Sequence, residues 1–514
     1  MSTGTETGTR RTLRDVLEVH RHADPQRVAL LDGDEAITYR QLCGRIAGVA
    51  HALAGHGIVR GDRVAVLLPN CPEYLEAFFG IVAIGAVAVP LNTRLHPAEQ
   101  VRLLQDCRPR LLLAHDDYGA SIATITAAMP ALEAVVRVGG TPAPGEHDYQ
   151  SWRGEADALP EVALTGEETA AILYTSGTTS APKGVMLTHR NYLADFAHVA
   201  AAIGLTPDSV NLQLSPLYHA AAVHTLVHLM AGGTTVLTPR FDPAWVLEQI
   251  ESRRVSYFFA VPTMLYQLLD HPEVARYDLV SLQTISYGAA AITGARLQQA
   301  LAVFGSKLLH AYGMTETTSH ASVLSPQDHL VAAGSIGRGL PGTTLRVIDE
   351  AGADAAPDAV GEIVVRGDNV MHGYWERIEE TAATLRNGWL HTGDLARVDS
   401  RGYVYIVDRK KDMVISGGVN IYPREVEEVL ARHPAVAEAA VYGVPDPHWG
   451  EALAASVVLK PGMHAREKEL LDFAREYLAG FKLPKQLALI DSLPKTASGK
   501  VQKTELRKQH TSTR

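Results

Sequence analysis

Residues 174 to 185, with the sequence YTSGTTSAPKGV, combine several hydroxyl side chains, two glycines and one lysine between apolar flanks. Glycines let successive backbone N–H groups turn toward one anion, while hydroxyls add hydrogen-bond donors and Lys183 adds a positive charge. This is the chemistry of a phosphate-binding loop. The GxxxxGK[ST] spacing of a Walker A motif is absent, and a Ser/Thr-rich surface turn is the alternative interpretation.

A second group of residues that could do chemistry lies at the C-terminal end. Residues 481 to 514 contain eight Lys or Arg against two acidic residues, a net charge of +6. The whole chain of 514 residues carries a formal charge of -10, so an anionic ligand must be held locally. We interpret the residues after about Gln509 as a solvated tail.

The composition excludes several classes of protein. The length predicts at least two domains, and the acidic balance argues against nucleic acid or an anionic membrane as a partner. Cys43, Cys71 and Cys107 form no CxxC pattern, so we expect reduced, buried thiols of a cytoplasmic protein. The most apolar stretch, residues 78 to 91, is too short to span a membrane and predicts a buried helix that runs into a strand.

Apolar runs of strand length alternate with helical patterns through the first four fifths of the chain. This alternation indicates parallel sheets that are covered by helices on both faces. The clearest strand predictions are residues 62 to 69, 111 to 116, 234 to 239 and 255 to 262. From about Pro341, short strands separated by glycines predict a small antiparallel sheet or barrel element. After residues 408 to 412 the pattern returns to mixed α/β, and we place a domain boundary at that charged segment.

The segment at 174 to 185 resembles the signature of the adenylate-forming superfamily, which includes acyl-CoA synthetases, adenylation enzymes and beetle luciferase. Further family motifs follow in order: YGMTE (312 to 316), TGD (392 to 394), DRKKDMVISGGVNIYP (408 to 423) and PKTASGKVQK (494 to 503). The resemblance implies an α/β fold. Its large N-terminal domain (1–408) would contain two parallel αβαβα sheets and the small barrel-like element. A hinge at 409–411 would precede a small mobile α/β C-terminal domain (412–514).

The resemblance also implies a nucleotide site. The β- and γ-phosphates of ATP would be held by Thr175, Ser176, Gly177, Thr178, Thr179 and Lys183. Tyr312 would stack on adenine, Thr315 would contact the α-phosphate, and Glu316 would support Mg²⁺. Asp394 would accept hydrogen bonds from the ribose hydroxyls, and Arg409 would reach the same ribose or phosphate. Gly288 and Ala289, in SYGAA (286 to 290), match the turn that lines both the adenine and the acyl group.

Lys500 matches the family lysine that bridges the attacking carboxylate and the leaving pyrophosphate. Such an ammonium stabilises the transition state more than the ground state. In the family, Lys411 occupies the pivot on which the small domain turns between two half-reactions. After this rotation of the small domain, the loop at Gly417 and Gly418 would shape the channel for the pantetheine arm of CoA. Glycines suit this position because any larger side chain would fill the channel.

The acyl pocket is predicted from SPLYHAAAVH (215 to 224), in which His219 takes the place of the family's aromatic gate. No aspartate lies between Leu212 and Thr225 to pair with an amine, which favours a plain carboxylic acid over an amino acid. The predicted lining residues are His219, Ala220, Ala221, Ala222, Val261, Met264, Tyr287, Ala289, Ala290 and Ala291. Small apolar linings leave volume, so we predict a bulky hydrophobic acid.

These inferences predict an AMP-forming acyl-CoA ligase that uses ATP, Mg²⁺ and coenzyme A. Ser180 replaces the glycine that the family usually has in its phosphate loop. One alternative is therefore an enzyme of the second half-reaction only, which takes acyl-AMP from a partner adenylating enzyme. A loader of a phosphopantetheine carrier protein and a non-catalytic nucleotide-binding module are further alternatives. The sequence leaves the oligomeric state open, a homo-oligomer included.

Overall fold

The computed structural model describes residues 12–175, 182–238, 240–290, 292, 294–416, 419–495 and 501–512. The chain divides into two compact units. The first comprises Met1–Leu345 with Val365–Leu390, and the second comprises Arg346–Val364 with His391–Arg514. The segment 409–411, where we expect a hinge, belongs to the second unit.

The first unit contains a nine-stranded sheet. Its strands are, in spatial order, β16 (Arg338–Gly339), β15 (Ser322–Leu324), β14 (Leu308–Tyr312), β13 (Thr284–Gly288), β12 (Tyr257–Ala260), β10 (Val210–Gln213), β11 (Thr234–Leu237), β1 (Val28–Asp32) and β2 (Glu35–Thr38). The strands from β14 to β1 are parallel, and antiparallel pairs lie at both edges. This arrangement confirms the prediction of parallel strands from the continuous apolar runs.

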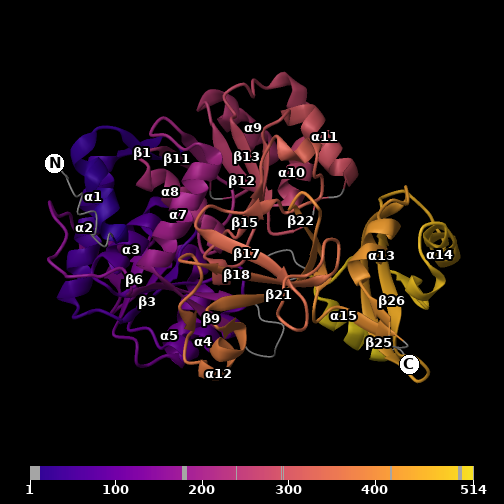
Figure 1. Cartoon of the computed structure of the whole chain (residues 1–514). Helices are drawn as coiled ribbons and strands as arrows, with labels where there is room; N and C mark the ends of the chain where they lie inside the picture. Colours follow the sequence, from indigo (N-terminus) through magenta and orange to yellow (C-terminus); the bar gives the residue numbers. More distant parts are fainter. Residues whose placement is uncertain are drawn as a thin grey trace, which may run out of the picture. The chain divides into compact units, whose positions relative to one another are not determined.

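Helices cover both faces of this sheet. On one face, α9 (Pro243–Ser252), α10 (Pro262–Leu269) and α11 (Gly294–Phe304) bury an apolar cluster that includes Phe258, Ile285 and Leu308. Figure 1 shows these helices beside β12 and β13. The other face is covered by α8 (Val223–Met230), which follows the short turn η2 (Ala220–Ala222) and packs on α7 (His189–Ile203).

The second large sheet of this unit has eight strands. They are β19 (Gly373–Tyr374), β9 (Lys183–Thr188), β8 (Thr169–Thr175), β4 (Val87–Pro90), β3 (Arg63–Leu67), β5 (Leu111–His115), β6 (Ala134–Val138) and β7 (His147–Asp148). Helices α4 (Pro97–Cys107) and α5 (Gly119–Ala128) bury one face. Helix α3 (Pro72–Ala83) contacts β3 and β4 and packs on α2 (Tyr39–Gly55). Helix α3 followed by β4 confirms the helix and strand predicted for residues 78 to 91.

The short strands after Pro341 form a five-stranded sheet, as the glycine-punctuated pattern predicts. They are β17 (Thr343–Ile348), β18 (Gly361–Gly367), β21 (Trp389–Val398), β20 (Leu385–Arg386) and β22 (Val404–Arg409).

The remaining helices of the first unit are α1 (Leu13–Ala23), α6 (Tyr149–Arg153) and α12 (Ile378–Thr384).

The C-terminal part has its own sheet and core. Its strands are β24 (Val419–Ile421), β23 (Val414–Ser416), β26 (Gly450–Leu459), β25 (Val436–Asp446) and β27 (Gln486–Leu489). Helices α13 (Pro423–Leu430) and α14 (Glu467–Arg475) share an apolar cluster with this sheet, and α15 (Lys503–Ser512) packs on β25. Helix α15 continues to Ser512, past the point at Gln509 from which we predicted a solvated tail.

Several basic residues near the C-terminus are paired with acids of the same unit. The Nζ atoms of Lys495 and Lys503 lie 2.7 Å from carboxylate oxygens of Glu438 and Glu427, respectively. Part of the positive charge counted in the sequence is therefore compensated locally, and Leu506 anchors α15 by burial.

All three cysteines are free thiols. Cys43 and Cys107 are buried as expected, whereas Cys71, at the start of α3, is only partly buried. Across the described ranges, no helix is both long enough and apolar enough to cross a membrane.

Candidate active site

The hairpin of β8 and β9 carries the two ends of the predicted phosphate loop. Thr175 is the last residue of β8 and pairs directly with Lys183, the first residue of β9. The residues between them that were assigned to phosphate binding lie outside the described residues: Ser176, Gly177, Thr178 and Thr179, together with Ser180. The hairpin therefore fixes the backbone of the lysine opposite Thr175.

The side chain of Lys183 lies against an aromatic ring that no sequence motif predicted. Its Nζ is 4.9 Å from the centroid of the Tyr374 ring, a cation–π distance. Tyr374 is in β19, which pairs with β9, so the strand pairing itself brings the ring to the lysine. The sequence offers one weak signal, the aromatic pair of Tyr374 and Trp375 after a glycine.

Tyr374 connects this lysine to a second motif. Its hydroxyl donates a 2.9 Å hydrogen bond to Oε1 of Glu316, and the carbonyl of Glu316 accepts one of 2.9 Å from the backbone N–H of Met371. Burial, reinforced by the negative charge of Glu316, raises the pKa of Tyr374 above its usual value, so the phenol stays protonated and able to donate. Lys183, Tyr374 and Glu316 thus form one connected group.

The backbone around YGMTE is closely packed. Strand β14 ends at Tyr312, which is 9% exposed, and Thr315 and Glu316 lie in the 3₁₀ turn η4 (Thr315–Thr317). A Cβ added to Gly313 would lie 1.9 Å from the carbonyl oxygen of Ser319, so only glycine fits there. The tight approach holds the turn at the carboxyl end of the sheet, where ligands of parallel sheets usually bind.

The SYGAA turn lies at the end of the neighbouring strand. A Cβ on Gly288 would lie 2.3 Å from the carbonyl oxygen of Ala311, which requires glycine. Ala289 has a φ of 64°, in the left-handed region that L-residues rarely adopt. Ala289 and Ala290 are both exposed, while Ala291 lies outside the described residues.

The predicted acyl-pocket residues are found on both faces of the nine-stranded sheet. His219 precedes η2, which is formed by Ala220, Ala221 and Ala222 and leads into α8. Val261 caps α10, and Met264 and Tyr287 pack with the cluster on the opposite, α9–α11 face, where the Tyr287 ring stacks on His310 at 4.7 Å. The described contacts therefore do not gather all of these residues in one cavity.

One apolar cavity adjoins His219. Its lining comes from β4 and β8 of the eight-stranded sheet, from α3, α7 and α8, and from the segment between β10 and α8: Tyr74, Phe78, Pro90, Leu173, Tyr192, Leu217, His219, Ala220, Ala222, Val223 and Leu226. Most of these residues were not identified from the sequence, because each one by itself has the pattern of ordinary core. The hydroxyl of Tyr74 donates to the carbonyl of Leu217 at 2.7 Å, which ties the segment before His219 to α3.

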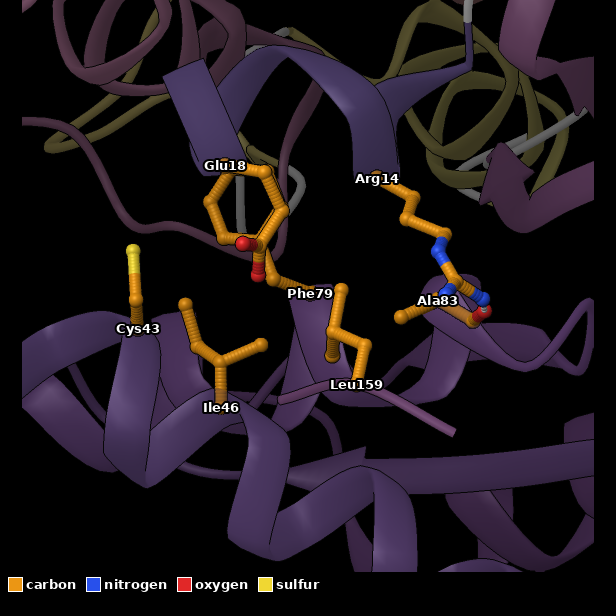
Figure 2. A pocket seen from close by; sticks show the side chains of 7 residues that line it. All are labelled: Arg14, Glu18, Cys43, Ile46, Phe79, Ala83 and Leu159. Atoms are coloured by element: carbon orange, nitrogen blue, oxygen red, sulfur yellow. Dashed lines mark hydrogen bonds between the residues drawn. The ribbon is translucent and has the colours of Figure 1, made fainter. Parts of the chain in front are cut away.

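Another small cavity lies beneath α1, between α2 and α3 (Figure 2). Arg14, Glu18, Cys43 and Phe79 are among its lining residues, and none of them belongs to the predicted site. Burial raises the pKa of the Cys43 thiol to about 12, so this cysteine is not a nucleophile at neutral pH.

In the second unit, Asp394 and Arg409 are brought together by strand pairing. They are directly opposite each other on β21 and β22, and Nε of Arg409 lies 3.3 Å from Oδ1 of Asp394. Asp394 is buried, whereas the Arg409 side chain is 44% exposed. Lys411 is exposed in the turn that follows. Gly417, Gly418 and Lys500 lie outside the described residues.

Comparison with known proteins decides the family. The model of the AMP-binding enzymes matches residues 17–375, and the model of their C-terminal domain matches residues 425–500. The chain belongs to the AMP-binding enzymes. Their adenylate-forming superfamily is the one that the five motifs resemble, and the relatives found are mainly ligases of the acyl-CoA branch.

Two relatives and two solved structures illustrate the relation of this AMP-binding enzyme to its family. A feruloyl-CoA synthase of Amycolatopsis is 41% identical over 94% of this chain and 96% of that protein. An indoleacetate–CoA ligase of Aromatoleum aromaticum is 36% identical over 96% and 97%. The anthranilate CoA ligase AuaEII with anthranoyl-AMP superposes with a TM-score of 0.89, at 29% identity over 98% and 97%. ATP-bound MatB of Rhodopseudomonas palustris gives 0.89 at 32%, over 97% and 99%.

Glu316 is the carboxylate of this AMP-binding enzyme that the motif resemblance assigns to Mg²⁺. Among the described residues no group of three or more His, Cys, Asp or Glu side chains could hold a metal ion. Mg²⁺ in nucleotide sites is usually bound by one or two carboxylates together with the phosphates. Glu316, with one oxygen engaged by Tyr374, retains lone pairs for such a role.

Proposed function

We propose that this protein is an AMP-forming acyl-CoA ligase. In the first half-reaction the carboxylate of an acid attacks the α-phosphorus of ATP, and the bond to pyrophosphate breaks. In the second, the CoA thiolate attacks the acyl carbon of the adenylate, which forms the thioester and releases AMP. The observation that carries the proposal is the connected group of Lys183, Tyr374 and Glu316.

This group joins the two motifs that must act on the same triphosphate. Lys183, with Thr175 and the loop 176–179, would bind the β- and γ-phosphates, while Glu316 would support Mg²⁺ and Thr315 the α-phosphate. The metal would neutralise phosphate charge as the pyrophosphate leaves. Tyr374 would act as a positioning residue, because its ring limits the reach of the lysine and its hydroxyl orients the carboxylate.

The second unit would supply the remaining contacts. Buried Asp394 would accept the ribose hydroxyls, and Arg409, more exposed, would swing between its carboxylate partner and the nucleotide. Lys500 would stabilise the first transition state. A rotation at 409–411, with Lys411 at the pivot, would exchange it for the loop at Gly417 and Gly418, beside which CoA would enter.

The acid is proposed to be bulky and largely hydrophobic. The cavity next to His219 is lined mainly by aromatic and aliphatic side chains, which supports the hydrophobic character of the acid, but its volume of about 10 Å³ is no evidence for a bulky one. His219 would lie at the carboxylate end. The names of the relatives support this class, because ferulate and indoleacetate are aryl acids.

A carrier protein is the second candidate for the thiol partner. A fatty acid–[acyl-carrier-protein] ligase of Streptomyces coeruleorubidus is 37% identical over 96% of this chain. The chemistry is the same, since a phosphopantetheine thiol replaces that of CoA. Parallel assays with CoA and with a phosphopantetheinylated carrier protein separate these acceptors by the mass of the product.

The decisive assay is thioester formation by mass spectrometry. A panel of bulky acids is supplied once as free acid with Mg-ATP and CoA, and once as preformed acyl adenylate with CoA. We expect comparable product by both routes. Product from the adenylate alone would assign the protein to the second half-reaction only. Ser180→Gly would then be the first variant to test for recovery of the first half-reaction. Nucleotide binding without any product would make it a non-catalytic module.

Tyr374→Phe tests the connected group within the same assay. The variant keeps the ring beneath Lys183 but loses the hydrogen bond to Glu316, so we expect kcat to fall roughly tenfold and the Mg²⁺ requirement to rise. Tyr118→Phe, at a tyrosine of the 3₁₀ turn before α5, is the control. Equal kcat values for Tyr374→Phe and wild type would show that Tyr374 has no role in the active site.

A further inference from the structure

The turn that follows the YGMTE segment has a strained backbone. Thr318, the buried residue after η4, has a φ of 63° and a ψ of -53°. The backbone N–H of Ser319 donates to the carbonyl oxygen of Thr317 at 2.7 Å. This hydrogen bond across a residue of positive φ defines a γ-turn of the rare, strained type. Threonine is β-branched, so positive φ is a genuine outlier for it, and the surrounding structure must hold Thr318 in this conformation.

The side chain of Asn369 provides much of this support. Asn369 is fully buried and lies two residues after the end of β18 at Gly367. Its Nδ2 donates to the carbonyl oxygen of Thr317 at 3.4 Å and to that of His320 at 2.6 Å. Its backbone carbonyl oxygen accepts a 2.8 Å hydrogen bond from Oγ1 of Thr318. Asn369 therefore bonds to the γ-turn at its central residue and on both sides of it.

The chemistry of these partners requires an amide at this position. Two carbonyl oxygens can only accept, so the group that faces them must be the NH₂ of the amide. Its Oδ1 accepts a 3.0 Å hydrogen bond from Oγ1 of Thr343 on β17. A Cβ added to Gly367 would lie 2.6 Å from this Oδ1, so the glycine leaves room for the amide. Neither a carboxylate nor a single hydroxyl could supply both donors to the turn.

Helix α7 holds the other side of the turn. The backbone N–H of His320 donates to Oδ1 of Asp195 at 3.1 Å, and Asp195 is fully buried. Asn191, one turn earlier on α7, donates from Nδ2 to the carbonyl oxygens of the two residues that flank Asn369, both at 2.7 Å. The γ-turn and the segment of Asn369 are thus fixed to the same helix, and all of these residues belong to the first unit.

The strained turn directly follows the residues assigned to the triphosphate. The backbone N–H of Thr318 donates to the carbonyl oxygen of Thr315 at 3.0 Å, so the γ-turn closes the η4 turn that carries Thr315 and Glu316. If Thr318 relaxed to negative φ, the chain would leave η4 in another direction and these two side chains would move with it. Strained residues persist where the surroundings over-determine them, and at binding sites the strain can pre-organise the geometry.

We propose that Asn369 is a positioning residue for the first half-reaction. By holding the strained turn at Thr318, it keeps Thr315 and Glu316 oriented toward the triphosphate and its Mg²⁺. The inference rests on the proposed ligase function. Groups that act on the departing pyrophosphate are needed when ATP is the substrate, but not when the acyl adenylate is supplied. Loss of the amide should therefore slow adenylate formation selectively, whereas a purely structural role would reduce both half-reactions alike.

The test measures both half-reactions on one preparation, so that differences in the fraction of folded protein cancel. Adenylate formation is followed as the burst of pyrophosphate from Mg-ATP with the best acid of the panel. Thioester formation is followed from the preformed adenylate with CoA. In Asn369→Ala we expect the ratio of the first rate to the second to fall by about tenfold or more, because small misplacements of reacting groups are costly. Thr318→Val, which loses only the hydroxyl bond to Asn369, should lower the ratio less.

Thr343→Val is the matched control. It removes the hydroxyl that donates to Oδ1 of Asn369 but leaves both Nδ2 bonds to the turn in place. Stability should fall, while the ratio stays at the wild-type value. A second readout needs no turnover: the Mg²⁺ concentration that gives half of the thermal shift with ATP. It should rise several-fold in Asn369→Ala and stay unchanged in Thr343→Val.

The outcomes separate this inference from the proposed function. A wild-type ratio in Asn369→Ala, or an equal fall in Thr343→Val, would overturn the role of Asn369 and leave the ligase intact. If Asn369→Ala does not fold, Thr318→Val is compared with Thr343→Val on the same criteria. If wild type forms thioester from the adenylate only, the Mg²⁺ concentration decides. Absence of product and of any thermal shift with Mg-ATP in wild type would overturn both proposals.

Discussion

The two faces of the nine-stranded sheet differ in what they bury. The face under α9, α10 and α11 holds an apolar cluster in which Phe258 and Ile285 are fully buried. The face under α8 buries polar groups instead, including His224, His228 and Tyr257. Buried polar groups cost stability unless they are hydrogen-bonded. The first face is therefore close-packed apolar core, whereas the second depends on hydrogen bonds made within the protein.

The largest expected difference between the two faces is at two adjacent phenylalanines on β12. Phe258 points to the apolar cluster, and Phe259 lies under the His224 ring. Phe258→Ala should reduce the free energy of unfolding by about 3 to 5 kcal/mol, because it leaves a cavity in close-packed core, and should leave substrate preference unchanged. Phe259→Ala should cost less stability but alter KM for aryl acids. Denaturant titration together with the acid panel measures both, and a reversed pattern would mean that the two faces are not divided in this way.

The pH dependence of stability is an effect of comparable size. Burial lowers the pKa of His228 and of His189 to about 4. An unfolded chain binds protons on these residues below pH 6.5, whereas the folded chain does so only near pH 4. The free energy of unfolding should therefore fall between those values, by about 1.4 kcal/mol per pH unit for each histidine, and be fully restored above pH 6.5.

Chemical denaturation at pH 7.5, 6.5, 5.5 and 4.5 tests this slope. His228→Gln and His189→Gln should each make it shallower, while Phe258→Ala, which removes no titrating group, should keep the wild-type slope at lower overall stability. A slope that is the same in all variants would show that other groups dominate the acid response.

One buried tyrosine hydroxyl on each face is expected to contribute a smaller amount to stability. The hydroxyl of Tyr257 bonds to His224, and that of Tyr287 lies 3.1 Å from Nε2 of His329. Each Tyr→Phe change leaves a buried ring nitrogen short of a partner and should cost about 1 to 2 kcal/mol. Denaturant unfolding measures both losses, and a variant as stable as wild type would show that its missing hydroxyl made no stabilising hydrogen bond.

The sequence predicted much of the fold, because parallel strands are visible as continuous apolar runs. The phosphate loop stays a prediction from a local pattern, a dense run of Gly, Ser and Thr. Tyr374 could not be found in this way, since it meets Glu316 and Lys183 only through the pairing of β19 with β9.

The smallest expected effect is at Ala289, where β13 ends. A left-handed alanine is strained, so Ala289→Gly should raise the free energy of unfolding by up to about 0.5 to 1 kcal/mol after the entropy of the unfolded glycine is offset. Ala290→Gly, at a neighbouring exposed residue without positive φ, should lower it by a similar amount. Strain at a ligand-binding turn usually fixes its geometry. We therefore expect Ala289→Gly to raise the melting temperature and also KM for ATP. If both variants lower the melting temperature equally, the turn stores no strain, and its alanine is present for contact with the ligand alone.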